Sequence, residues 1–193
     1  MEIKYKLYPY PVLSSYSNDY GTGAFDVAID IVRDGYDLRI DFLATLTCQS
    51  LQDCIKQGVA KFVYHLECSQ TGFRTVVQTD KVSEVYTLLN KAVNGKLQIC
   101  PFVVAVDDLK GFTSPDFHED YQGIAFDIEA GCVMAVGKMV TVDISKDIDD
   151  LANTPSIFNI SKNPDESCKQ MLVDMSQRKI IIKLPLSDFY SYK

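Results

Sequence analysis

Apolar and polar side chains alternate most regularly between residues 25 and 42. Every second residue from Phe25 to Ile31 is apolar, and after Asp34-Gly35 the alternation resumes through Leu38 to Phe42. A period of two is typical of a β-strand with one buried face. Asp-Gly between two such runs supplies the positive φ angles of a tight primed turn. The pattern therefore predicts a β-hairpin with one apolar and one charged face.

Short strand-like segments continue along the rest of the chain, separated by turn residues such as those at 69–72 and by a polar loop at 107–122. The predicted strands cover residues 62–66, 73–77, 96–106, 124–128, 132–136, 139–144, 157–160, 169–174 and 178–184. The three strands between 124 and 144 predict a meander. Residues 82–93 fit both a helix and a strand, and the strand is slightly favoured.

Two segments have the pattern of a short helix. In residues 50–57, Leu51, Cys54 and Ile55 form an apolar stripe, and Ser50 is the predicted N-terminal cap. Residues 186–193 resemble the start of a second helix capped by Ser187, or a truncated linker. Helix is thus a minor component of the predicted fold.

Many short strands with one or two short helices predict an all-β fold rather than βαβ units. The expected architecture is an antiparallel β-sandwich or a jelly-roll-like barrel. The 193 residues fit a single domain spanning 1–193, in which residues 1–23 form an N-terminal arm rich in tyrosine and proline.

The composition narrows the classes of function. The chain has 19 basic and 26 acidic side chains, a net charge of −7, which argues against direct binding of nucleic acid. No apolar run approaches the ~20 residues of a membrane span. The six cysteines contain no C-x-x-C pair and stand mostly in apolar segments, which favours buried reduced thiols. We therefore expect a cytoplasmic protein without a membrane segment.

The acidic loop at 107–120 is the main candidate for a metal site. Asp116, His118 and Asp120 offer carboxylate and imidazole ligands for a divalent metal. Neighbouring side chains in one loop do not all converge on one ion, and the spacing matches no metal motif. The alternative interpretation is a solvated acidic connector. A divalent metal is the one cofactor that the sequence suggests, and otherwise none is expected.

No catalytic residue is assigned from the sequence. The chain lacks the G-x-S-x-G nucleophile elbow, the G-x-x-x-x-G-K-[ST] phosphate loop, the G-x-G-x-x-G turn and the H-E-x-x-H zinc motif. Asp143, Asp147, Asp149 and Asp150 resemble part of a calcium loop, but the required glycine and closing glutamate are missing.

Aromatic and acidic residues suggest surfaces for contact with other proteins. Tyrosine is effective at partly wet protein interfaces, because it has a large apolar body and a hydroxyl group. The alternative is an edge strand whose rings cover the domain's own core. The predicted interface residues are Tyr8, Tyr10, Tyr16, Tyr20, Asp107, Asp108 and Glu119.

The leading hypothesis is a non-enzymatic protein–protein interaction or assembly module of a larger intracellular complex, of phage, mobile-element or antiphage origin. Its partner is another protein or a second copy of the chain. One alternative is a metal-dependent enzyme centred on residues 107–120. Another is an acidic mimic of nucleic acid, whose carboxylates between 107 and 150 occupy a basic groove on a partner.

Overall fold

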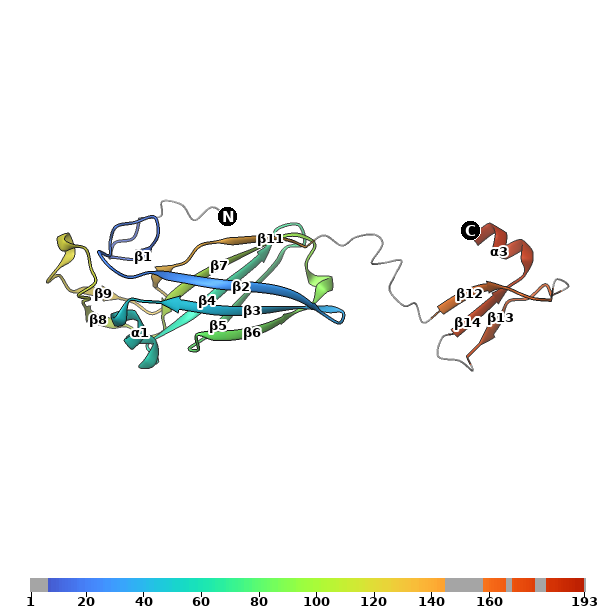
Figure 1. Ribbon diagram of the computed structural model, residues 1–193, viewed down its shortest axis with the longest axis horizontal. Helices are drawn as coiled ribbons and strands as arrows, with labels where there is room; N and C mark the ends of the chain where they lie inside the picture. Colours follow the sequence, from blue (N-terminus) through green and yellow to red (C-terminus); the bar gives the residue numbers. More distant parts are fainter. Residues whose placement is uncertain (1–6, 145–157, 166–167, 176–179, 193) are drawn as a thin grey trace. The chain divides into compact units, whose positions relative to one another are not determined.

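A computed structural model of the chain describes residues 7–144, 158–165, 168–175 and 180–192. Contacts divide the chain into two compact units, Met1–Ser145 (the first unit) and Lys146–Lys193 (the second unit). This division is absent from the single-domain prediction. Both units consist mainly of β-strands, labelled in Figure 1. Among the described strands no sheet closes into a barrel.

The predicted hairpin is confirmed as β2 (Phe25–Asp34) and β3 (Asp37–Leu46), which pair antiparallel along their whole length. Asp34 pairs with Asp37, so the turn residues are Gly35 and Tyr36 rather than Asp34 and Gly35. Gly35 has a φ of +62°, as a primed turn requires. The third strand of this smaller sheet is β6 (Ser83–Leu88), which confirms the preference for a strand within 82–93 and precedes a 3₁₀ turn, η1 (Asn90–Ala92).

A larger sheet has the strand order β1-β10-β7-β4-β5, and β11 also pairs with β7. The N-terminal β1 pairs parallel to β10, so the sheet is not wholly antiparallel. The strands are β1 (Leu13–Ser14), β4 (Ala60–Cys68), β5 (Phe73–Thr79), β7 (Gly95–Ala105), β10 (Val133–Val136) and β11 (Val140–Ile144).

The meander predicted between 124 and 144 is wrong, although its three strands exist. Both β10 and β11 pair with β7, and β9 (Phe126–Ile128) belongs to a different sheet. The change from β11 to β10 occurs at Pro101 of β7, which has no N–H to donate to a ladder. Gly137 passes this point, and its N–H donates to the Pro101 carbonyl at 2.9 Å. A Cβ on Gly137 would lie 3.2 Å from the Pro101 side chain, so a larger residue here would require a small shift of Pro101 or Phe25.

The core of the first unit lies between its two sheets. Phe42 of β3 and Tyr64 of β4 stack with ring centroids 4.2 Å apart, and both are almost fully buried. Phe25 stacks on Phe62 in the same way, at 6.0 Å. Alternate residues of β3, β4 and β7 supply the rest of the core, as the period of two predicts.

The predicted helix is confirmed as α1 (Gln49–Lys56), with Leu51, Cys54 and Ile55 buried. The predicted cap is wrong, because Cys48 is the N-cap residue and its side chain makes no capping hydrogen bond. The Ser50 hydroxyl instead lies 2.9 Å from the Ser114 hydroxyl.

The segment predicted as a polar loop at 107–122 contains a strand. β8 (Leu109–Phe112) pairs antiparallel with β9 (Phe126–Ile128), and between them lies a 3₁₀ turn, η2 (Glu119–Tyr121). Figure 1 places β8 and β9 at the end of the first unit where α1 and β1 also lie.

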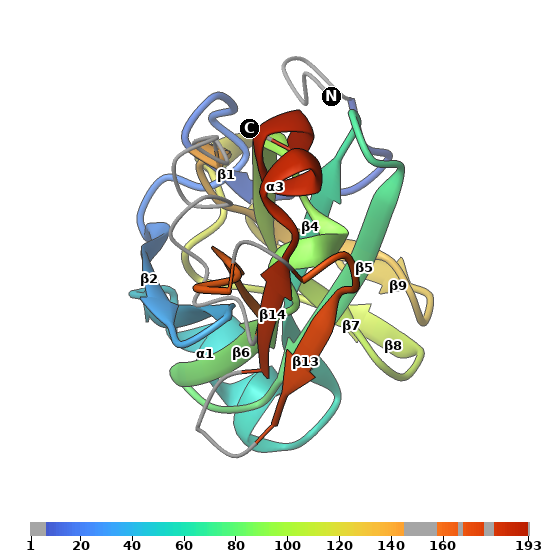
Figure 2. The ribbon, with the colours of Figure 1, turned by 90° about the vertical axis from the view of Figure 1, so that its right-hand side faces the viewer.

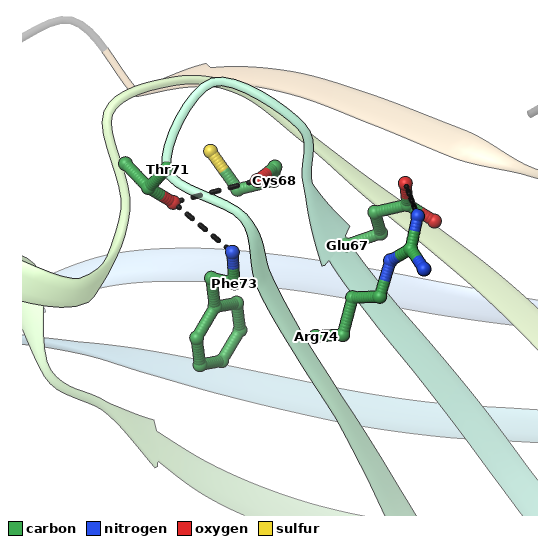
Figure 3. Close-up of polar contacts among 5 residues, drawn as sticks. All are labelled: Glu67, Cys68, Thr71, Phe73 and Arg74. Atoms are coloured by element: carbon green, nitrogen blue, oxygen red, sulfur yellow. Dashed lines mark hydrogen bonds and ion pairs between the residues drawn. The ribbon is translucent and has the colours of Figure 1, made fainter.

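The turn between β4 and β5 shows how local polar contacts shape the strand ends (Figure 3). The Thr71 hydroxyl donates to the Cys68 carbonyl and accepts from the Phe73 N–H, both at 3.4 Å. Arg74 pairs across the strands with Glu67 at 3.0 Å. The second predicted hairpin is therefore confirmed, with residues 69–72 as its connection.

The second unit contains β12 (Phe158–Lys162), β13 (Leu172–Asp174), β14 (Ile180–Leu184) and α3 (Leu186–Tyr192). Its sheet order is β12-β14-β13, with β12 parallel and β13 antiparallel to β14 (Figures 1 and 2). Three strands were predicted here, but not the parallel pair. Residues 176 and 177, which lie between two of the predicted strands, and positions 147, 149 and 150 of the calcium-like series are outside the described residues.

Candidate functional site

Asp116, the first residue of the metal hypothesis, is bonded to segments that are distant in the sequence. The Thr22 hydroxyl donates to its Oδ1 at 2.7 Å, and the Cys48 thiol donates to its Oδ2 at 3.3 Å. The Asp116 carbonyl accepts from the Gly21 N–H at 2.9 Å. Asp116 therefore connects the loop after β8 to two other segments. These are the residues near Gly21, which precede β2, and the N-terminus of α1.

Cys48, which shares this network, is buried. Burial is the main cause that raises the pKa of the Cys48 thiol to about 11, and the Asp116 carboxylate adds to the shift. The thiol is therefore neutral near pH 7 and acts as a hydrogen-bond donor, since only the thiolate is a good nucleophile. All six cysteines are free thiols.

The His118 side chain contacts Asp120. Its Nδ1 lies 3.1 Å from Asp120 Oδ2 and accepts from the Asp120 N–H at 3.4 Å, which caps η2. His118 and Asp116 do line the same open hollow, of about 280 Å³, together with Thr22 and Glu119. Within the described residues, however, no three His, Cys, Asp or Glu side chains stand close enough to hold one metal ion.

Aromatic rings hold the loop between β8 and β9 in place. Phe117 is 3% exposed, and its ring makes edge contacts with Tyr20 at 5.0 Å and with Phe112 and Phe126 at 5.9 Å. Tyr121 adds an edge contact with Phe126 at 6.0 Å. The acidic segment is therefore a folded projection with packed aromatic rings, and its acidic side chains at 107, 108, 119 and 120 are exposed.

Two carboxylates of this projection, Asp108 and Asp127, accept hydrogen bonds from its own backbone. Asp108 accepts from the Ala130 N–H at 2.9 Å. Asp127 accepts from the Gly111 N–H at 2.9 Å and pairs with Lys110 at 3.3 Å. The hydrogen bond from Gly111 is the main cause that lowers the pKa of Asp127, and the contact with Lys110 adds to the shift. Asp107 and Glu119 are exposed.

The four tyrosines of the predicted interface differ in how far they are buried. Tyr10 and Tyr20 pack against the core of the first unit, and burial raises the pKa of both hydroxyl groups. Tyr8 is half-buried, with its ring 6.0 Å from that of Tyr10, and Tyr16 is 37% exposed. At least two of the four rings thus cover the chain's own core, which was the alternative interpretation.

A surface that sequence reasoning missed lies on β13 of the second unit. Leu172 and Val173 are neighbours and project to opposite faces of the sheet, yet they are 49% and 50% exposed. Met171 and Met175, on either side of the strand, are 58% and 74% exposed. Neither face of β13 is therefore covered.

The sheet around β13 has one apolar face. Ile160, Ile182 and Val173 stand side by side across the three strands, whereas Ser161 and Lys183 stand beside Leu172 on the other face. The side chains of Ile160 and of all residues in β13 and β14 are at least partly exposed, whereas Pro185, directly after β14, is buried. The sequence signal for this surface is Met171-Leu172-Val173, an apolar run without alternation, which places apolar side chains on both faces of the strand.

The first unit has exposed apolar side chains as well, but they are mixed with charges. Leu43 and Val85 are 55% and 49% exposed on the outer face of the smaller sheet. They line a hollow of about 390 Å³ with Asp41 and Arg39, whose side chains form an ion pair at 2.9 Å. The strand β13 is the more strongly apolar surface.

Among the described residues, no helix is both long and apolar enough to cross a membrane. No family model, curated protein or solved structure matches this chain.

Proposed function

We propose that this protein is a non-enzymatic interaction module that assembles with another protein chain through β13. The observation that carries the proposal is the exposure of this strand on both faces, in a unit where Ile160 and all side chains of β13 and β14 are at least partly exposed. Units of about 50 residues bury little surface and commonly need a disulfide, a metal or an association to be stable. The thiol of Cys168, the one cysteine of the second unit, is free.

The mode of binding that fits β13 is strand addition. An extended segment of the partner would pair with its backbone, and apolar side chains would cover Leu172 and Val173. The partner segment therefore has an apolar side chain beside Val173 on one face. In the first unit, we propose that the two sheets stacked through Phe42 and Tyr64 form a β-sandwich that serves as the stable body of the module.

The proposal includes no catalytic group. Asp116 and His118, the residues of the metal-dependent alternative, have separate partners inside the fold. The six free thiols support a location in a reducing compartment.

The test is cross-linking in cells that naturally produce the chain, followed by mass spectrometry of the captured proteins. Val173→Asp places a charge on β13, and Val76→Asp is the matched control, because Val76 is 47% exposed on the edge strand β5 of the first unit. We expect Val173→Asp to lose a protein, or further copies of the chain, that the wild type and Val76→Asp both capture. An identical set of captured proteins for all three chains would contradict the proposal.

A further inference from the structure

The outer edge of β13 is open to another strand. The sheet order places β13 at the end of the sheet, and within the described residues no strand pairs with its second side. An edge of this kind presents unpaired N–H and C=O groups that template a further strand. Since both faces of β13 are also exposed, a strand added there would cover apolar side chains as well as form hydrogen bonds.

The residues of β13 are self-complementary in an antiparallel arrangement. If two copies pair about Val173, each Val173 stands opposite the other, and each Leu172 stands opposite Asp174 of the second copy. Asp174 is the one charged residue of the strand. The two carboxylates are then offset from each other, which avoids the like-charge pair that destabilises sheets.

The next strand supplies a complementary charge. Lys183 of β14 pairs with Leu172, so both side chains are on the same face of the sheet. In the paired arrangement, Asp174 of the second copy stands on the other side of Leu172, on that same face. The two Cα atoms are then about 9–10 Å apart, twice the spacing between strands, which a lysine side chain can span. Because the dimer has two-fold symmetry, the contact between Lys183 of one copy and Asp174 of the other occurs twice.

The charge of the second unit also permits self-association. Lys146–Lys193 contain seven basic and seven acidic side chains and have no net charge, whereas Met1–Ser145 contain 12 basic and 19 acidic side chains and hold the whole net charge of −7. Two copies that meet through their second units therefore meet without net repulsion at the contact. A contact between two first units would oppose two acidic surfaces.

We propose that the partner of β13 is β13 of a second copy of this chain, paired antiparallel about Val173 in a symmetric dimer. This inference rests on the proposed function, to which it adds the identity of the partner. The interface is of the isologous type, in which the same patch is used by both subunits.

The experiment measures the mass of the full chain by sedimentation velocity over a range of concentrations. We expect the wild type to dimerise. Asp174→Lys and Lys183→Glu each place like charges across the proposed contact, and each weakens dimerisation by about tenfold or more, which corresponds to about 1.4 kcal/mol. Lys162→Glu is the matched control, because it makes the same charge change on β12 at the opposite edge of the sheet and leaves dimerisation unchanged.

A mixture of the two variants separates contacts between copies from contacts within one copy. In a heterodimer of Asp174→Lys with Lys183→Glu, both cross-copy pairs are again of opposite charge, whereas the pairs within each chain are unchanged. We expect the mixture to form heterodimers, detected with a fluorescent label on one variant, at concentrations where each variant alone is monomeric. Circular dichroism of each variant confirms that it is folded.

Three results would overturn the inference: a wild type that is monomeric at every concentration, a dimer indifferent to both variants, or a mixture that stays monomeric. None of them contradicts the proposed function by itself. A monomeric wild type that still captures a different protein, and loses it in Val173→Asp, would retain the function and exclude only self-pairing.

Discussion

The two units of this protein differ in how completely they bury their apolar side chains. In the first unit two sheets face each other, and side chains such as Phe42, Tyr64 and Ile99 are at most 1% exposed. In the second unit a single three-stranded sheet has Ile160, Ile182 and Val173 side by side on one face, and none of them is buried. The comparison teaches that strands alone do not make a core, because a sheet becomes stable only when a second layer covers its apolar face.

Separating the units gives the largest expected effect. Residues 1–145 produced alone should unfold cooperatively. Their melting temperature should lie within a few degrees of the melting temperature of the first unit in the whole chain. Residues 146–193 alone, in dilute solution, should show no cooperative transition, because about 50 residues with one open face bury too little surface. Thermal unfolding followed by circular dichroism is the measurement. A sharp transition of 146–193 that is independent of dilution would break the comparison.

Truncating one apolar side chain in each unit comes next. Phe42→Ala should destabilise the first unit by about 3–5 kcal/mol, because Phe42 is 1% exposed and stacks on Tyr64. Ile182→Ala should cost the second unit less than about 2 kcal/mol, since Ile182 is only half-buried. Urea unfolding of the full chain measures both. Equal losses would mean that the second unit has a complete core.

Asp116→Ala tests what attaches the acidic projection to the first unit. The change leaves the Thr22 hydroxyl and the Cys48 thiol without their acceptor, and we expect a loss of about 1–3 kcal/mol in urea unfolding. Asp107→Ala is the control, because this carboxylate is exposed, and its effect should stay within about 0.5 kcal/mol. If both variants were equally stable, the Asp116 network would not be structural.

Tyr64→Phe has the smallest expected effect, and it is favourable. The Tyr64 hydroxyl is buried without a hydrogen-bond partner among the described residues, so removing it should stabilise the first unit by about 1 kcal/mol. Burial raises the pKa of Tyr64 to about 12, so the group is neutral in the folded chain and the gain should be the same at pH 6 and pH 8. Tyr16→Phe, on an exposed ring, should change nothing, and a destabilised Tyr64→Phe would reveal a partner for the hydroxyl.

Local patterns were read correctly because their causes are local. The hairpin of β2 and β3 follows from alternation and one Asp-Gly pair, and α1 follows from the stripe of Leu51, Cys54 and Ile55. The cap of α1 was misassigned, because the Ser50 hydroxyl pairs with Ser114, 64 residues away, and no pattern near Ser50 reports that contact.

The candidate sites were harder to predict because exposure is a property of the whole fold. Tyr10 and Tyr20 were expected at an interface, yet they pack on the core. Asp116 was expected to bind a metal, yet its oxygens accept from Thr22 and Cys48. The apolar strand at Leu172 was read as an ordinary strand, since a sequence does not show which strand lies at the edge of a sheet.

By itself, the amino-acid sequence determined that this chain is mainly β, which regions hold most of its strands, and that its net charge is acidic. Those properties depend on side chains a few residues apart, whose period and charge can be read directly. Only the tertiary structure decided that β10 and β11 share β7, that the net charge belongs to one unit, and that β13 is exposed. Strand order and burial depend on contacts between distant residues, which no local pattern encodes.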